Sequence, residues 1–250
     1  MNRFIYTFAV IAIFVTAAFA NANDHDEYVG DYRFLLSKYT QAATQEDINA
    51  VLVNYKAWGR DQRHQSAMAS LQKLNPKLLS ANEKMAFWIN AYNLLTIDLI
   101  IKTGETKSIK NQGSLFRNVW KSHKWEIDGT AYTLDEIEHD ILRPMGNPSV
   151  HMAINCASLS CPDLRGEPYD AKRLKQQLNE QTMLFLSDQT KGVYITESGL
   201  RPSKIFDWFQ ADFGGKQGVI DFIHRHLPHI ASKEIDGYLD YNWRLNELQK

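Results

Sequence analysis

Four side chains that can act as a nucleophile, a base or a metal ligand lie close together in the middle of the sequence. His139, His151, Cys156 and Cys161 all fall within the segment 139–161. A cysteine thiolate is a strong nucleophile once a neighbouring base or a set of backbone amides lowers its pKa. Cys156 follows an apolar run and begins a turn rich in small residues. It is therefore the candidate nucleophile for hydrolysis or acyl transfer on an amide or ester.

The base that would activate Cys156 is one of two histidines. If the apolar run before Cys156 is a buried strand, its side chains alternate between faces, which places His151 and Cys156 on opposite faces. His139 belongs to the preceding helix and is the alternative base, with Glu138 or Asn90 available to orient it. On a regular helix Glu138 points about 100° away from His139. The spacing in the sequence does not decide which of the two histidines is the base.

Other interpretations of the same cluster remain open. Cys156 and Cys161 are close enough in sequence to form a disulfide that would fix the turn between them. The two histidines and two cysteines could also ligate zinc, but their spacing lacks the tight pairs of most zinc sites. We therefore predict no metal and no cofactor, with a zinc enzyme as a minor alternative. The residues expected to contact a substrate are Asn93, Arg143 and Ser158.

The most apolar part of the sequence after the first twenty residues, Met85 to Ile101, is predicted to be a helix surrounded by protein. Ser80 and Glu83 have the spacing of a capping box at its start. Asn90 and Asn93 lie on the same side of this helix, and a buried amide without a partner costs about 1 to 3 kcal/mol. Both amides must therefore bond either neighbouring backbone or polar groups of a site.

The remaining elements follow from periodicity and turn signals. Apolar spacings of three and four predict helices through most of the segment 28–79, including Ile48, Val51, Leu52 and Tyr55. Asp128-Gly129 predicts a hairpin, and Thr133 with Glu136 predicts a capped helix that ends before Pro144. Further predictions are a strand over Val150–Cys156, helices over 169–186, 203–213 and 218–227, a second hairpin over 193–200, and an aromatic tail packed on the domain.

Together these elements predict a single α+β domain with N-terminal helices, a central buried helix and a small, mostly antiparallel sheet. The arrangement is loosely similar to a papain or transglutaminase core by analogy. The chain has 250 residues with 28 basic and 29 acidic side chains, so its charge gives no reason to expect a nucleic acid partner. The expected partner is an envelope substrate or protein.

The first residues have the features of a secretory signal peptide. Arg3 precedes an apolar run from Phe4 to Phe19, which ends in the small-x-small sequence Ala18-Phe19-Ala20. The run is shorter than the roughly 20 residues that a spanning helix needs. We therefore expect cleavage near Ala20 or after Ala22, a periplasmic or secreted product, and no stable membrane span afterwards.

Five separated motifs resemble, in order, those of the domain of unknown function 547 family. The motifs are Phe87–Asn93, Leu134–His139 with Leu142-Arg143, His151–Pro162, Ser203–Phe209 with Asp212-Phe213, and Tyr241–Asn246. Asn242 stands where the family usually has an aspartate. The leader, the helical periodicity and the resemblance together divide the chain into a signal peptide over 1–20, an N-terminal helical region over 21–79 and a family core with its tail over 80–250. The resemblance implies no particular reaction. Many bacterial members are secreted or lipid-anchored, in agreement with the leader.

The residue chemistry and the resemblance leave two functional hypotheses. The first is a thiol-dependent hydrolase or acyl transferase in which Cys156 is the nucleophile. The second is a non-catalytic envelope protein that binds a peptide, a glycan or a protein partner through its C-terminal half, rich in tryptophan and tyrosine. In the second case the cysteines are structural.

Overall fold

The computed structural model describes residues 24–113, 118–230 and 234–248; the predicted signal peptide lies outside them. A helix over residues 24–39 comes first. The next elements are β1 (Thr40–Gln45), β2 (Ile48–Val53), α2 (Tyr55–Trp58), α3 (Gln62–Lys73), α4 (Ala81–Thr103), β3 (Trp125–Ile127), β4 (Thr130–Tyr132) and α5 (Leu134–Glu136). The last are α6 (Leu174–Ser187), β5 (Val193–Ile195), β6 (Leu200–Pro202), α7 (Ile205–Trp208) and α8 (Gly215–His226).

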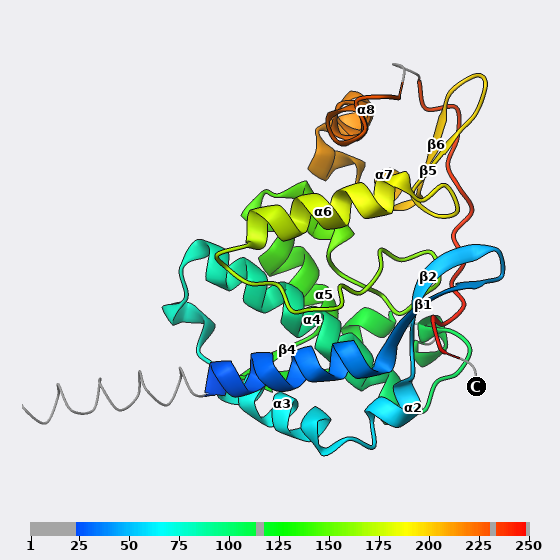
Figure 1. Cartoon of the computed structure of the whole chain (residues 1–250). Helices are drawn as coiled ribbons and strands as arrows, with labels where there is room; N and C mark the ends of the chain where they lie inside the picture. Colours follow the sequence, from blue (N-terminus) through cyan, green and yellow to red (C-terminus); the bar gives the residue numbers. More distant parts are fainter. Residues whose placement is uncertain (1–23, 114–117, 231–233, 249–250) are drawn as a thin grey trace, which may run out of the picture.

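Helix α4 lies at the centre of the molecule, as its sequence predicts (Figure 1). The capping box of Ser80 and Glu83 is formed at its start, and every residue from Met85 to Ile100 is buried. The buried carboxylate of Asp98 accepts hydrogen bonds from three side chains, His64 at 3.0 Å, Trp125 at 2.6 Å and Lys102 at 2.7 Å. A charge inside the protein is tolerated here because it is fully paired.

The strands form three separate antiparallel hairpins, β1-β2, β3-β4 and β5-β6, which together with the helices confirm the α+β class. The turn predicted at Asp128-Gly129 joins β3 and β4, and both residues have positive φ, 50° and 68°. Two central residues with positive φ define the turn type whose twist matches that of the flanking strands.

The predicted helix is wrong for Ile48, Val51 and Leu52, because residues 40–53 form the β1-β2 hairpin, whereas Tyr55 begins the short helix α2. The two residues of its turn, Glu46 and Asp47, have φ of 51° and 59°. Neither is a glycine or an asparagine, so the usual sequence signal of this turn is absent. The apolar residues of β2 lie on both faces of the strand and differ in burial. Their spacing of three and four therefore resembled that of a helix.

The predicted strand over Val150–Cys156 is also wrong. Residues Pro148–Met152 form a short 3₁₀ helix, in which the side chain of Asn147 accepts a hydrogen bond from the backbone of Ser149. An irregular segment carries the chain on to Cys156. A short, continuous apolar run fits a buried strand and a buried helical turn equally well. The alternation that placed His151 and Cys156 on opposite faces therefore does not apply.

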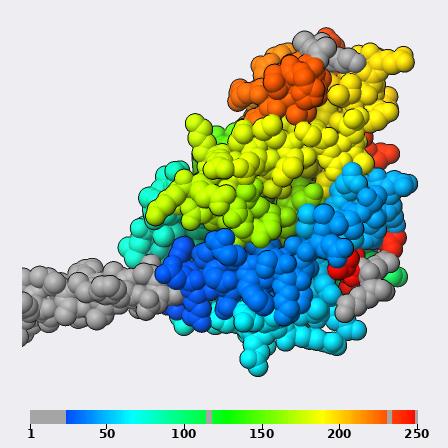
Figure 2. Space-filling model, in the orientation of Figure 1, coloured from blue at the N-terminus to red at the C-terminus, as the bar shows by residue number. Residues whose placement is uncertain are grey.

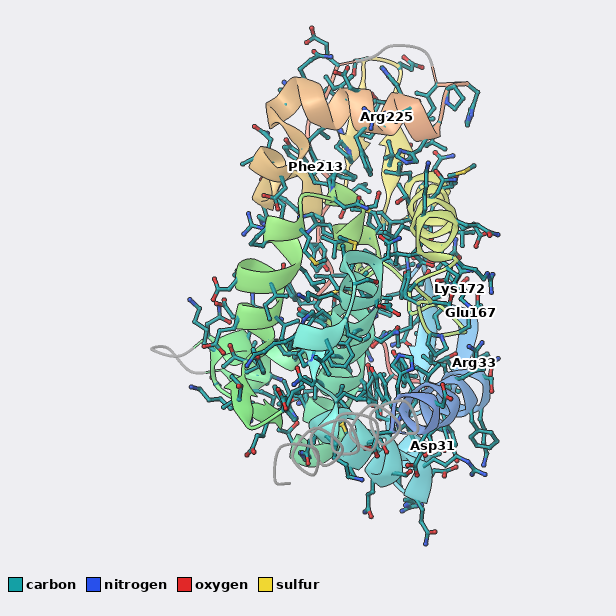
Figure 3. All side chains as sticks on the ribbon, turned by 90° about the vertical axis from the view of Figure 1, so that its left-hand side faces the viewer. Asp31, Arg33, Glu167, Lys172, Phe213 and Arg225 are labelled. Carbon is teal, nitrogen blue, oxygen red and sulfur yellow. A yellow bond between two sulfur atoms is a disulfide. The ribbon has the colours of Figure 1, made fainter. Side chains whose placement is uncertain are left out.

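The apolar side chains form two large clusters. The main core surrounds α4, and a C-terminal core is built from the end of α6, the β5-β6 hairpin, α7 and α8. Figure 2 shows the C-terminal elements, yellow to orange, as the upper part of the molecule above the blue and cyan N-terminal elements. Phe213 belongs to this upper part, while Arg33 and Glu167 lie far from it and form an ion pair at 3.5 Å (Figure 3).

The C-terminal tail packs back on the domain, as predicted from its aromatic residues. It runs alongside both parts of the molecule (Figure 1) and pairs with Leu200, Ser158 and Val53 through Ile235, Leu245 and Glu247. None of the helices in the described part of the chain combines the length and the apolar character needed to cross a membrane.

Candidate functional site

A cavity of about 250 Å³ lies where side chains of the two cores meet. Six aromatic side chains of the described residues line it: Tyr92, Trp120, Trp208, Phe209, Tyr241 and Trp243. Its polar side chains include Asp135, Glu138, His139 and His151, and both cysteines also line it. The four residues of the reactive cluster predicted from the sequence thus share one cavity.

One helical segment supplies three of these polar groups. Thr133 caps α5 through the predicted box with Glu136, and the helix continues as a π-helical stretch over Ile137–Leu142. Asp135, Glu138 and His139 are spaced as i, i+3 and i+4, so they share a face. Glu138 and His139 both line the cavity, although consecutive helical residues differ in direction by about 100°. π-Helical turns are frequent at functional sites.

Arg143 and Asp212 form the centre of a charged network beside the cavity. The guanidinium of Arg143 donates to both carboxylate oxygens of Asp212, at 2.6 and 2.8 Å. A third donor of Arg143 lies 3.0 Å from Nδ1 of His139, and Nε2 of His151 lies 2.7 Å from Asp212. These hydrogen bonds from Arg143 lower the pKa of Asp212, so the carboxylate is charged and His151 donates to it.

Both histidines of the cavity are neutral at pH 7. Burial lowers the pKa of His139, and Arg143 can donate only to an unprotonated Nδ1. Burial lowers the pKa of His151 to about 4, although its bond to Asp212 acts in the opposite direction. The ring of His151 is stacked on Phe209, with their centroids 4.2 Å apart. His151 is thus held in one orientation and one tautomer.

Glu138 is the buried carboxyl group of the cavity, with 9% of the residue exposed. Burial raises its pKa to about 7, and a hydrogen bond from the hydroxyl of Tyr92 at 3.2 Å partly offsets this effect. A carboxyl group with a pKa near neutrality can give up or take a proton at physiological pH. This places a proton-exchanging group in the cavity wall.

The structure joins Cys156 and Cys161 in a disulfide, with their Cα atoms 6.1 Å apart. This is one of the two states that the sequence left open. The hydroxyl of Tyr241 lies 3.3 Å from the sulfur of Cys156 and 3.2 Å from that of Cys161. Ser158 also lies 3.4 Å from the Cys156 sulfur. Neither sulfur has a hydrogen bond to a histidine in the described residues, so Cys156 is not an activated thiolate in this state.

Asn90 and Asn93 each bond backbone groups, which is one of the two outcomes expected from the sequence. The amide of Asn90 accepts from the backbone nitrogen of Tyr169 and donates to its carbonyl, each at 2.8 Å. The amide of Asn93 likewise joins Ala153, at 2.9 Å, and Asn155, at 2.8 Å. Neither asparagine is among the described residues that line the cavity. Asn93 nevertheless holds the segment that leads to Cys156.

Several residues of the site were not predicted from the sequence. Asp212 bonds Arg143 and His151 from a distant part of the chain, and Asp135 precedes His139 by one helical turn. The signal for Asp212 was its place in a family motif, and that for Tyr241 and Trp243 was the aromatic character of the tail. Of the predicted substrate contacts, Arg143 contacts Asp212, Ser158 contacts Tyr241, and neither is among the described residues of the cavity wall.

The zinc alternative finds no support in the donor set. Both sulfur atoms are bonded to each other, and the described residues contain no group of three or more histidine, cysteine or acidic side chains placed to hold a metal ion.

The fold is a small α+β domain, and side chains of its two apolar cores line the same cavity. Residues 76–186 match the family model described as "Protein of unknown function, DUF547", which supports the resemblance carried by the sequence motifs. The matched segment includes α4, Glu138, both cavity histidines and both cysteines, whereas Trp208, Asp212 and the aromatic tail lie after it. No curated protein and no solved structure matches the chain.

Proposed function

We propose that the chain is an exported protein of the cell envelope that binds a small organic ligand in this cavity. The observation that carries the proposal is that aromatic side chains, carboxyl groups and imidazole groups line one cavity of about 250 Å³. Ligand sites typically combine apolar walls with a few polar groups that fix the orientation of the ligand. The disulfide is then structural, because it fixes the turn between Cys156 and Cys161 as part of the wall.

The exposed part of the wall is centred on Trp208, which is 47% exposed. Its ring is stacked on Trp243 with centroids 5.6 Å apart and an interplanar angle of 25°. Tyr241 contacts both indoles, with centroid distances of 4.8 and 4.6 Å. A large aromatic side chain that remains exposed beside a cavity, in contact with other rings, is a suitable platform for a ligand.

Trp208→Ala is expected to weaken ligand binding at least tenfold with little loss of stability, since the ring is nearly half exposed. Ligand-observed NMR with a library of neutral and charged organic fragments checks this, followed by titration of the fragments that bind. Leu184→Ala is the matched control, because Leu184 is 66% exposed and lies on α6 outside the cavity wall. Fragments that bind equally well to the Trp208→Ala variant would contradict the proposed site.

A thiol-dependent hydrolase or acyl transferase is the second candidate. The observation that favours it is that Cys156 lines the same cavity as His139, His151 and Glu138. The disulfide would have to be reduced first, so that Cys156 can act as the nucleophile. Neutral His151, oriented by Asp212, or neutral His139 would then take the thiol proton.

Intact-mass measurement of the exported protein, before and after iodoacetamide, separates the two candidates. A structural disulfide predicts no labelling without reductant and two labels after reduction and unfolding. A working thiol predicts rapid labelling of folded, mildly reduced protein at one site, lost in Cys156→Ser and kept in Cys161→Ser. The same masses test export, because the mature chain should begin at Asn21 or Asn23. A chain that still begins at Met1 would contradict the proposed cleavage.

A further inference from the structure

The charged side chains that line the cavity have one sign. Asp135 and Glu138 contribute carboxyl groups, and the described residues of the wall include no lysine or arginine. His139 and His151 add no charge at pH 7, because burial lowers the pKa of both. The cavity wall is therefore acidic and would repel a phosphate or carboxylate ligand.

The cations closest to these carboxyl groups are bound elsewhere or lie at the surface. Arg143 is held by both oxygens of Asp212, which balances its charge. Lys121 lies 3.4 Å from Asp135, but its side chain is 61% exposed. Such a surface ion pair contributes only about 0 to 1 kcal/mol, so Asp135 remains available to a ligand that enters the cavity.

Two rings of the wall already hold cations of the chain itself. The ammonium of Lys110 lies 4.9 Å from the centroid of Trp243, and the guanidinium of Arg143 lies 5.1 Å from that of Phe209. The electron-rich face of an aromatic ring attracts a cation, most strongly when water is excluded. No described lysine or arginine occupies Trp208 or Tyr241 in this way.

Aromatic rings and carboxyl groups line the cavity together, and the described wall has no lysine or arginine. From this juxtaposition we propose that the ligand is an organic cation, a small molecule that carries an amine or a quaternary ammonium group. The inference rests on the proposed binding function and names the ligand class for the same cavity. The ammonium group lies near Asp135 and Glu138, and its carbon substituents contact the rings of Trp208 and Tyr241. A cavity of about 250 Å³ suits one such group and a short chain.

Ligand binding is coupled to the protonation of Glu138. The groups that act on its carboxyl come from several elements: Tyr92 of α4, Asp135 and Arg143 of the α5 segment, Asp212 near α7 and Tyr241 of the tail. A cation beside Glu138 favours the ionised form, so binding near pH 7 releases a proton. Affinity for the cation therefore rises with pH and becomes constant above the range in which Glu138 titrates. His139 does not contribute to this proton release, because it is already neutral at pH 7.

Choline and 3,3-dimethyl-1-butanol form a matched pair of probes for this proposal. The two molecules have the same shape, but a carbon atom replaces the charged nitrogen in the alcohol. Isothermal titration calorimetry at pH 8 with the oxidised, full mature chain should show choline binding at least tenfold more tightly. Glu138→Gln should reduce choline affinity about tenfold and leave the affinity for the alcohol unchanged. At pH 7, titrations in two buffers of different ionisation enthalpy should show proton release, which the same variant abolishes.

The outcomes separate the ligand class from the site itself. Equal affinity for the charged and the uncharged probe, or stronger binding of a neutral sugar such as N-acetylglucosamine, would overturn the assignment of a cationic ligand. If that binding is still lost in Trp208→Ala, the cavity remains the binding site. If neither these probes nor any fragment of the library binds in a Trp208-dependent way, both proposals fail. A thermal unfolding curve of Glu138→Gln shows whether the variant is folded. Should it unfold, Asp135→Asn with the same pair of probes gives the decisive comparison.

Discussion

Glu138→Gln is expected to stabilise the folded protein by about 3 kcal/mol at pH 8. The pKa of Glu138 rises from 4.5 to about 7 on folding, and each unit corresponds to about 1.4 kcal/mol. Between these two values the folded protein binds a proton that the unfolded chain has released, so the stability contributed by this group decreases as the pH rises. It is fully present below about pH 4.5 and is lost as the pH passes 7. Glutamine cannot ionise and avoids this loss.

Denaturant unfolding of both proteins at pH 4 and pH 8 measures the effect. We expect the variant to gain stability only at the higher pH. Glu136→Gln is the matched control on the same segment, because hydrogen bonds from Thr133 lower the pKa of Glu136 and the substitution should destabilise the protein at pH 8. A pH-independent difference between wild type and Glu138→Gln would contradict the burial of an ionisable carboxyl at this position.

The comparison needs the variant because His151 masks the effect in the wild type. The pKa of His151 falls from 6.5 to about 4 on folding, so its contribution to stability is present above pH 6.5 and is lost as the pH falls through 4. The contribution of Glu138 changes in the opposite direction over an overlapping range. A nearly flat stability profile of the wild type between about pH 4.5 and 6.5 is therefore expected even though both groups are strongly perturbed.

Asn93→Ala and Asn90→Ala are each expected to destabilise the protein by about 3 kcal/mol, but only the first should impair ligand binding. Each substitution removes two buried hydrogen bonds and leaves a backbone carbonyl and a backbone N–H without their partner, at a cost of about 1 to 3 kcal/mol for each group. Asn93 holds Ala153 and Asn155, on either side of Ile154 in the cavity wall. Asn90 holds Tyr169, which is not part of that wall.

Urea unfolding gives the stability of both variants, and titration of whichever fragment binds the wild type gives their affinity. A fivefold or greater loss of affinity in Asn93→Ala, with wild-type affinity in Asn90→Ala, is the expected result. If Asn90→Ala loses affinity to the same extent, then the amide of Asn90 has a role in the site that its bonds to Tyr169 do not account for.

The sequence correctly predicted those helices for which the capping residues and the apolar periodicity indicate the same element. Helix α4 carries a capping box, a continuous apolar surface and a closing glycine, and the helix after Thr133 carries its own box. Strand β2 of the β1-β2 hairpin and the segment before Cys156 were predicted wrongly for a common reason. Each is a short apolar segment whose period fits more than one backbone conformation, and its tertiary neighbours decide between them.

The site was predictable only where its residues are close in sequence. Both histidines and both cysteines fall within the segment 139–161, so the sequence predicted them as one cluster, and all four line the cavity. Asp212 and the rings of Trp208, Tyr241 and Trp243 come from later elements that fold back onto this segment. No spacing rule in the sequence relates them to His151. A disulfide requires the two Cα atoms to come close together, and their distance of 6.1 Å could not be read from the spacing of the cysteines in the sequence.

The seam between the two apolar cores runs through the cavity. On one side Tyr92 and Ile154 belong to the main core, and on the other Ile205 belongs to the C-terminal core. A bound molecule would touch both and act as a removable crosslink between the two halves of the fold. Its binding free energy would then also resist their separation. Ligand binding and separation of the two cores are consequently coupled equilibria. A higher concentration of free ligand would make the folded domain more resistant to opening.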